Sequence, residues 1–172
     1  ENDRYVIYNY AEKTWYYGNL SRTAFLDRGI REFPLATANN YVYNHESGYT
    51  DDGSAMTSTI ESSAIDLGDG DRFASISRII PDFTFNGSTT TDPKVDLTVK
   101  ANEYPGADFS QSDAKTVTRS STSTTVPFEQ YTNKADIRVR GRAFAIKVDC
   151  TTGGVRWRLG NPRVDLRQDG RR

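Results

Sequence analysis

Turn-forming residues recur along most of this sequence, and their placement constrains the fold more than any other feature. Sets built from Gly, Asn, Asp and Pro occur at residues 68–71, 86–87, 92–93, 105–106, 153–154 and 161–162. These residues tolerate the backbone angles of tight turns, and short segments between such turns are typical of strands in a β-sandwich. The sequence therefore predicts an all-β fold with an antiparallel β-sandwich-like domain.

The clearest strand lies at residues 95–101, where apolar residues occupy every odd position and polar residues every even one. A period of two puts one kind of side chain on each face, so we expect a strand with one buried face. Asn86 and Gly87 follow Phe83 and Phe85, and both residues of this pair tolerate positive φ. A two-residue turn is therefore expected there.

A later apolar stretch changes phase partway along. Ile137 and Val139 occupy odd positions, whereas Phe144 and Ile146 occupy even ones. A shift of one residue moves side chains to the opposite face of a straight strand. We therefore expect a β-bulge near Gly141, where glycine permits unusual backbone angles.

The pair Gly153–Gly154 predicts a reversal of the chain into residues 155–159, where apolar residues alternate with two arginines. We expect these residues to form a hairpin with the strand before them. Asn161–Pro162 should end it, and Val164 and Leu166 predict one last short strand.

The N-terminal part is rich in aromatic residues. Residues 5–17 predict a hairpin around polar turn residues, residues 41–43 predict a short aromatic strand, and a polar loop follows. We place the division of the chain after residue 55. This gives an N-terminal β segment at residues 1–55 and a sandwich-like domain at residues 56–172.

Composition excludes several classes of protein. A chain of 172 residues has room for one full-sized core, and an aromatic content of 12% suits half-buried sheets. No stretch approaches the roughly 20 apolar residues that span a bilayer, so no membrane insertion is expected. The single cysteine, Cys150, leaves no intrachain disulfide and is expected to be a small buried hydrophobe. A start at Glu1 on an aromatic run suggests a fragment or a processed chain.

Charge is unevenly distributed although the net charge is only -1. Residues 138–172 hold ten Lys and Arg against three Asp and Glu, which leaves twelve against twenty in residues 1–137. Arginines at alternating positions project from one side of a strand and suit carboxylates or phosphates. The candidates for intersubunit or nucleic-acid contact are Arg138, Arg140, Arg142, Arg156, Arg158 and Arg163. Assembly through salt bridges is the preferred interpretation, in part because the other end of the chain is acidic. Stacking aromatic residues among the arginines would favour nucleic acid, but only Trp157 is present and its alternation places it in the core.

No pattern of catalytic or metal-binding residues stands out. His45, the only histidine, lies in a polar loop without a nucleophile motif, and we expect it to be exposed to solvent. Asp66, Asp69 and Asp71 cluster around two glycines and form a weak cation candidate, but their spacing does not match an EF-hand, so a structural turn is preferred. We expect a non-enzymatic chain with no cofactor and no metal.

Three segments carry a resemblance to a known family. They are WYYGNLSRTAFLDRGI at residues 15–30, IDLGDGDRFASISRIIPDF at residues 65–83 and RVRGRAFAIKVDCTTGGVRWRLGNPRVDLRQDGRR at residues 138–172. They resemble C-terminal regions of tail nozzle or stabilisation proteins of short-tailed bacteriophages, the tail tubular protein B type. The closing segment is the most specific of the three, and it implies a native C-terminus at Arg172.

The resemblance also implies an architecture and a function. Residues 5–45 would correspond to the final blade of a β-propeller, and most of that propeller is absent from this sequence. The implied protein is a virion structural protein of the tail nozzle, a homo-oligomeric and typically hexameric ring that contacts adaptor and other tail proteins. Viral DNA would pass through it during ejection. Such a protein is assembled in the host cytoplasm and belongs to the virion tail.

Two other functions stay open. A receptor- or carbohydrate-binding sandwich predicts that Trp15, Tyr16, Tyr41 or Tyr43 line an open groove. A tail-associated depolymerase would instead need a pair of acids in a cleft.

Overall fold

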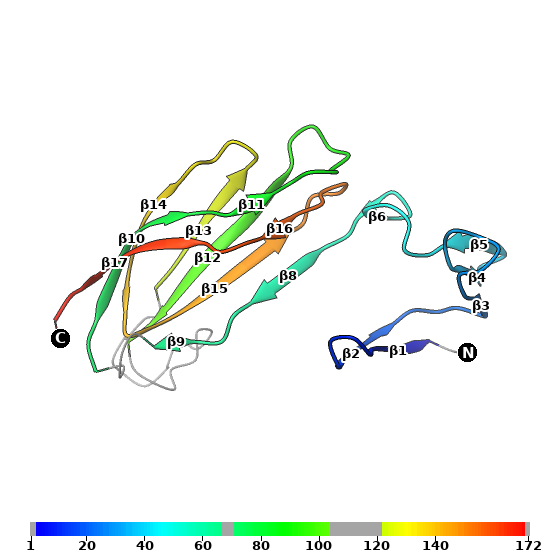
Figure 1. Ribbon diagram of the computed structural model, residues 1–172, viewed down its shortest axis with the longest axis horizontal. Helices are drawn as coiled ribbons and strands as arrows, with labels where there is room; N and C mark the ends of the chain where they lie inside the picture. The colour runs from blue at the N-terminus through cyan, green and yellow to red at the C-terminus, as the bar shows by residue number, and fades with distance from the viewer. Residues whose placement is uncertain (1–2, 67–70, 104–121, 171–172) are drawn as a thin grey trace. The chain divides into compact units, whose positions relative to one another are not determined.

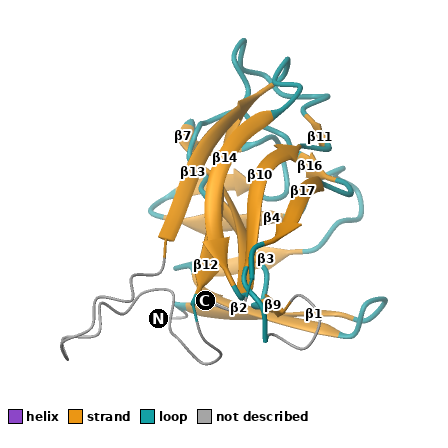
Figure 2. Cartoon of the chain, turned by 90° about the vertical axis from the view of Figure 1, so that its left-hand side faces the viewer, coloured by secondary structure: helices purple, strands orange, loops and turns teal. Residues whose placement is uncertain are grey.

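The computed structural model describes residues 3–66, 71–103 and 122–170. These residues form strands, turns and loops, and Figures 1 and 2 draw no helix among them. The strand pairs are antiparallel, so the prediction of an all-β, antiparallel fold is confirmed. No helix that could cross a bilayer occurs in this part of the chain. The chain divides into two compact units, Glu1–Gly48 and Tyr49–Arg172, called here the N-terminal unit and the C-terminal unit.

The N-terminal unit consists of a hairpin and a three-stranded sheet. The hairpin joins β1 (Arg4–Asn9) to β2 (Thr14–Asn19), as the aromatic pattern predicts. The sheet has the order β3-β4-β5, with β3 at Ala24–Leu26, β4 at Leu35–Ala38 and β5 at Tyr41–Asn44. Its buried hydrophobic side chains are small, Ala36 and Ala38. The correspondence with a propeller blade stays a prediction.

The C-terminal unit contains two main sheets that pack face to face (Figure 1). The first has the order β14-β10-β17, with β14 at Ala135–Gly141, β10 at Ala74–Ile80 and β17 at Arg163–Gln168. The second has the order β13-β12-β15-β8, with β13 at Thr122–Glu129, β12 at Lys94–Asn102, β15 at Ala143–Cys150 and β8 at Ser58–Glu61. Three short pairings complete the unit. Strand β9 (Ile65–Asp66) also pairs with β15. Strand β6 (Thr50–Asp51) pairs with β7 (Ser54–Ala55), and β11 (Phe83–Thr84) pairs with β16 (Arg158–Leu159).

Alternating apolar residues of both sheets form the core of the C-terminal unit. Val95, Leu97 and Val99 of β12 are at most 1% exposed, which confirms the one-sided strand predicted at residues 95–101. They belong to one cluster with Ile137 and Val139 of β14. Because both sheets contribute one apolar face to this cluster, the arrangement is sandwich-like.

Cys150, the last residue of β15, is 2% exposed and has no disulfide partner. The expectation of a small buried hydrophobe at this position is confirmed.

The phase change between Val139 and Phe144 has a different cause from the predicted bulge. Residues on either side of Gly141 belong to different sheets, since β14 pairs with β10 and β15 pairs with β12. The chain turns a corner at Arg142, whose backbone N–H donates to the carbonyl of Asn102 at 2.7 Å. The apolar residues of the core cluster lie at odd positions in β14 and at even positions in β15 because the two strands face the core from opposite sheets.

A bulge does occur, but in β10. The register with both neighbouring strands shifts between Ile76 and Arg78. As a result Ile76 and Ile79 are both buried although one position is even and the other odd. The sequence gives no glycine at this place, so the bulge was not anticipated.

The predicted hairpin around Gly153–Gly154 is wrong, although the chain does turn there and Gly154 has a φ of 73°. Strand β15 pairs with β12, β8 and β9, whereas Leu159 pairs with Phe83 of β11. Asn86–Gly87 likewise forms a turn, in which Ser88 N–H donates to the Phe85 carbonyl at 3.1 Å. The last strand predicted around Val164 and Leu166 is present as β17.

Gly141→Ala should destabilise the C-terminal unit by about 1–3 kcal/mol, because an added Cβ would lie 2.7 Å from Ala101 Cβ and 2.9 Å from the Asn102 carbonyl. Gly153→Ala is the matched control, since its Cβ would meet nothing closer than 3.4 Å. Chemical denaturation of both variants measures the difference. Equal stabilities would contradict the tight corner.

Candidate functional site

The outer face of the β14–β10–β17 sheet carries several of the predicted arginines. Arg138 and Arg140 project outward from β14, because the alternating Ile137 and Val139 point into the core. Arg163 lies at the start of β17 opposite Ile80 of β10. We call this surface the charged sheet face; its charged residues are Arg78, Asp136, Arg138, Arg140, Arg163, Asp165, Arg167 and Asp169.

Arg78 lies at the centre of the charged sheet face, between acidic residues from both neighbouring strands. Its Nε is 3.0 Å from Asp136 Oδ1, and its Nη1 is 3.6 Å from Asp165 Oδ2. The hydrogen bond from Arg78, and after it the charge of Lys134, lowers the pKa of Asp136 below its ordinary value. Sequence reasoning missed Arg78, because the bulge in β10 hides its outward orientation from a simple alternation.

Arg140 and Arg142 both lie over the ring of Phe73, with their Cζ atoms 4.0 and 4.7 Å from the ring centroid. Arg140 Nε also forms an ion pair with Asp169 at 2.5 Å. Arg142 is half-buried at the corner between the sheets and does not continue the outward row of β14. Of the predicted row of three arginines, strand β14 itself contains Arg138 and Arg140, because the chain changes sheets at Arg142.

Arg156 and Arg158 do not belong to the β14–β10–β17 sheet. Arg156 is half-buried, with its Cζ 5.8 Å from the ring centroid of Tyr49. Arg158 is exposed on β16, which pairs with β11. Trp157 between them packs against the core and donates from Nε1 to Ser58 Oγ at 2.9 Å, as its predicted inward orientation requires.

The charged sheet face is thus mixed in sign. Arg78 and Arg140 have acidic partners, whereas Arg138 and Arg163 form no ion pair with any described residue. A mixed surface of this kind suits a complementary protein surface, while a long phosphate backbone attracts rows of cations.

No group of three or more His, Cys, Asp or Glu residues in the described ranges is placed to hold a metal ion. Asp69, at the centre of the weak cation candidate, lies outside those ranges.

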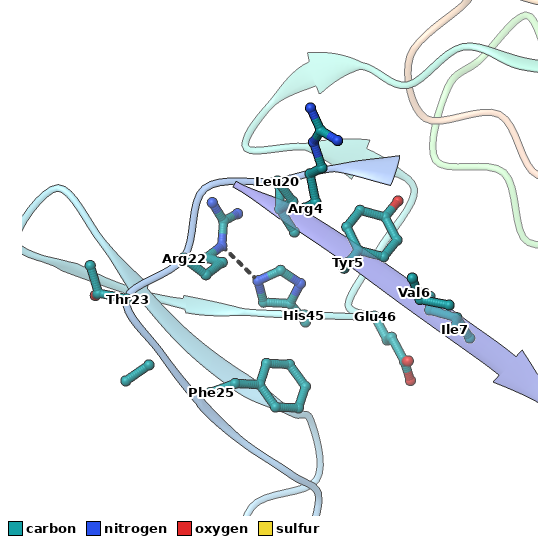
Figure 3. Close-up of a pocket in the computed structure, with 11 residues that line it drawn as sticks. Arg4, Tyr5, Val6, Ile7, Leu20, Arg22, Thr23, Phe25, His45 and Glu46 are labelled. Atoms are coloured by element: carbon teal, nitrogen blue, oxygen red, sulfur yellow. Dashed lines mark hydrogen bonds between the residues drawn. The ribbon is translucent and has the colours of Figure 1, made fainter. Parts of the chain in front are cut away.

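A pocket of about 680 Å³ lies within the N-terminal unit (Figure 3). It is lined by Arg4, Tyr5, Val6, Ile7, Leu20, Arg22, Thr23, Ala24, Phe25, His45 and Glu46. These residues come from β1, from the connection between β2 and β3, from β3 itself and from the segment after β5. No motif marks them in the sequence, because they are brought together from three separate segments.

The polar centre of the pocket is Arg22. Its Nε donates to His45 Nε2 at 3.0 Å (Figure 3). Its Nη1 donates to the Ser21 carbonyl oxygen at 2.7 Å, and its Cζ lies 5.0 Å from the Tyr43 ring centroid. His45 also packs edge-on to Phe25, with ring centroids 6.1 Å apart. The expectation of a solvent-exposed His45 is wrong, because these contacts leave it half-buried.

The N-terminal unit also exposes many large apolar side chains. Those that are more than half exposed are Val6, Ile7, Tyr10, Trp15, Tyr16, Tyr17, Phe25, Leu26, Ile30, Tyr41 and Val42. The adjacent residues Val6 and Ile7 point to opposite faces of β1, so both faces of the hairpin are apolar. We call this set the apolar surface of the N-terminal unit.

The outer face of the larger sheet holds half-buried ion pairs. Lys100 Nζ lies 2.5 Å from Glu61 Oε1, and Lys147 Nζ lies 2.9 Å from Asp149 Oδ2. A hydrogen bond from Thr59 lowers the pKa of Asp149, and the lysines add to this effect against the opposing effect of desolvation. These contacts tie β8 to β15 and β12.

Comparison with known proteins adds no assignment. No model of a known protein family matches the sequence, and no curated protein matches it at a significant level.

Asp149→Asn should lower the free energy of unfolding at pH 7 by about 1 kcal/mol, since a hydrogen-bonded, ion-paired carboxylate is lost. Because the folded-state pKa of Asp149 is depressed, its contribution is complete above the unfolded carboxyl pKa of about 3.9 and disappears as the pH falls through the lower folded value. Urea denaturation at pH values from 7 to 2 measures the free energy of unfolding of the wild type and of Asp149→Asn. Asp92→Asn, an exposed loop substitution, should match the wild type throughout. A pH-independent difference would contradict this assignment.

Proposed function

We propose that this chain is a structural subunit of the tail of a short-tailed bacteriophage, and that it assembles with copies of itself and with neighbouring tail proteins into a ring. The ring forms part of the conduit for genome ejection. The choice of this assembly rests on the resemblance of residues 15–30, 65–83 and 138–172 to tail nozzle proteins. The proposal assigns the chain no reaction.

The observation that supports a role in an assembly is the apolar surface of the N-terminal unit. Large amounts of exposed apolar surface are rare on monomeric proteins and mark contacts with other proteins. The buried hydrophobic residues of the unit, Ala36 and Ala38, provide little core to hold it folded by itself. Neighbouring protein would cover these side chains and complete the folding of the unit.

The charged sheet face supplies a second contact of a different kind. Rim charges steer association and set its register more than they add affinity. We assign Arg138 and Arg163 to acidic groups of the adjacent subunit, because neither has an acidic partner among the described residues of its own chain. Contact with DNA in transit is the other use of the same guanidinium groups.

The mass and symmetry of the native assembly test the proposal, and mass photometry with electron microscopy of the purified protein measures them. We expect a closed ring. Arg138→Glu should weaken ring formation at least about tenfold because it introduces repulsion at the contact, and Arg158→Glu, an exposed arginine outside the charged sheet face, should not. A monodisperse monomer would rule the proposal out. If Arg138→Glu forms intact rings but loses affinity for duplex DNA, Arg138 is assigned to DNA contact instead.

Carbohydrate binding is the second candidate, and the exposed aromatic hairpin favours it. Tyr8 and Trp15 form a cross-strand pair with ring centroids 4.4 Å apart, and Trp15 is 70% exposed. Aromatic rings of this kind give sugars an apolar surface with a polar rim. None of Trp15, Tyr16, Tyr41 and Tyr43, however, lines the pocket described above.

Under this alternative, Trp15→Ala should abolish binding on a glycan array, because the stacking surface is lost. Tyr10→Ala, at a position in the hairpin turn that is 84% exposed, should retain it. Absence of any glycan bound by the wild type would rule the alternative out.

A further inference from the structure

The pocket of the N-terminal unit has an excess of positive charge. Arg4 and Arg22 both line it, and neither forms an ion pair with a described residue. The one carboxylate in the lining, Glu46, is 3.3 Å from Nη2 of Arg28, which lies outside the lining. The pocket therefore favours an anion.

The guanidinium of Arg22 is held in place before any ligand arrives. His45 accepts from Nε, which requires the neutral imidazole with its proton on Nδ1. The Ser21 carbonyl and the Tyr43 ring fix the rest of the group. Of the five N–H donors of a guanidinium, these contacts use two, so both donors on Nη2 and one on Nη1 remain for a ligand. We call these remaining donors on Nη1 and Nη2 the Arg22 fork. Their planar arrangement matches the two oxygens of a carboxylate.

The walls around this fork are mostly apolar. Val6, Leu20 and Phe25 line the pocket together with Tyr5 (Figure 3). Ala24 lines it as well. A volume of about 680 Å³ lies within the usual range for small-ligand pockets, which combine apolar walls with a few placed polar groups. A bare inorganic anion would leave these walls uncovered, whereas an apolar body would cover them.

We propose that this pocket binds an organic carboxylate with an apolar or aromatic body, with the carboxylate on the Arg22 fork and the body against Phe25 and the β1 side chains. The ligand is either a free organic acid or the C-terminal residue of another polypeptide, since both present the same chemistry. The proposal is argued from contacts within the N-terminal unit and does not rest on the proposed tail function, although Val6, Ile7 and Phe25 also belong to the apolar surface of that unit.

The test is a titration of the full chain with benzoate and with N-acetylphenylalanine, followed by the NMR resonances of the Arg22 Nε–H and the His45 ring. We expect saturable shifts with dissociation constants of roughly 0.1–10 mM, as for fragments of this size. The neutral amides of both probes should bind at least about tenfold more weakly, because the charge-assisted fork is lost. Tighter binding of benzoate assigns a free acid, and tighter binding of N-acetylphenylalanine assigns a polypeptide C-terminus.

Two variants and a control complete the test. Arg22→Gln should weaken carboxylate binding at least about tenfold, and Ala24→Phe should abolish it by filling the pocket. Arg31→Gln, an exposed arginine outside the lining, should bind as the wild type does. If Arg22→Gln unfolds the unit, the proposal is still tested by comparing the affinities of the wild type for the acids and for their neutral amides. Equal binding of acids and amides, or no shift with either acid at about 20 mM, overturns the proposal.

Discussion

The close contact between Gly141 and the end of β12 determines how the rest of the C-terminal unit is arranged. At this corner the chain leaves one sheet and enters the other, and Arg142 is tied to Asn102 by a backbone hydrogen bond of 2.7 Å. A side chain at position 141 would occupy the space of Ala101. Because the corner fixes both strands, it places Val139 and Phe144 in the same core from opposite sheets.

The two units differ in how their apolar residues are used. In the C-terminal unit, alternating residues of β12 face the apolar residues of β10 and β14, and the core closes on itself. In the N-terminal unit, residues such as Val6, Ile7 and Trp15 remain exposed on strands of similar composition. A two-stranded hairpin is marginally stable alone, since it has no second layer to cover it. The N-terminal unit therefore leaves a larger share of its apolar side chains exposed.

The register of the strands determines which charged side chains lie next to one another. Arg78 meets Asp136 and Asp165 because β10 lies between β14 and β17, and the bulge sets which residues face one another. The result is a surface on which Asp136 and Asp165 flank an arginine from a distant segment. The charged sheet face carries five arginines and three aspartates, so it is less one-sided than the ten basic and three acidic residues of the segment 138–172.

Local pattern determined a large part of this structure. The alternation at residues 95–101, the aromatic hairpin at residues 5–17 and the buried Cys150 all follow from side-chain period and polarity, which act over a few residues. Tertiary structure alone decided which strands pair. It turned the phase change at Gly141 into a change of sheet, paired β16 with β11 and placed His45 against Arg22. These outcomes depend on contacts between residues far apart in the chain, and no local period encodes such contacts.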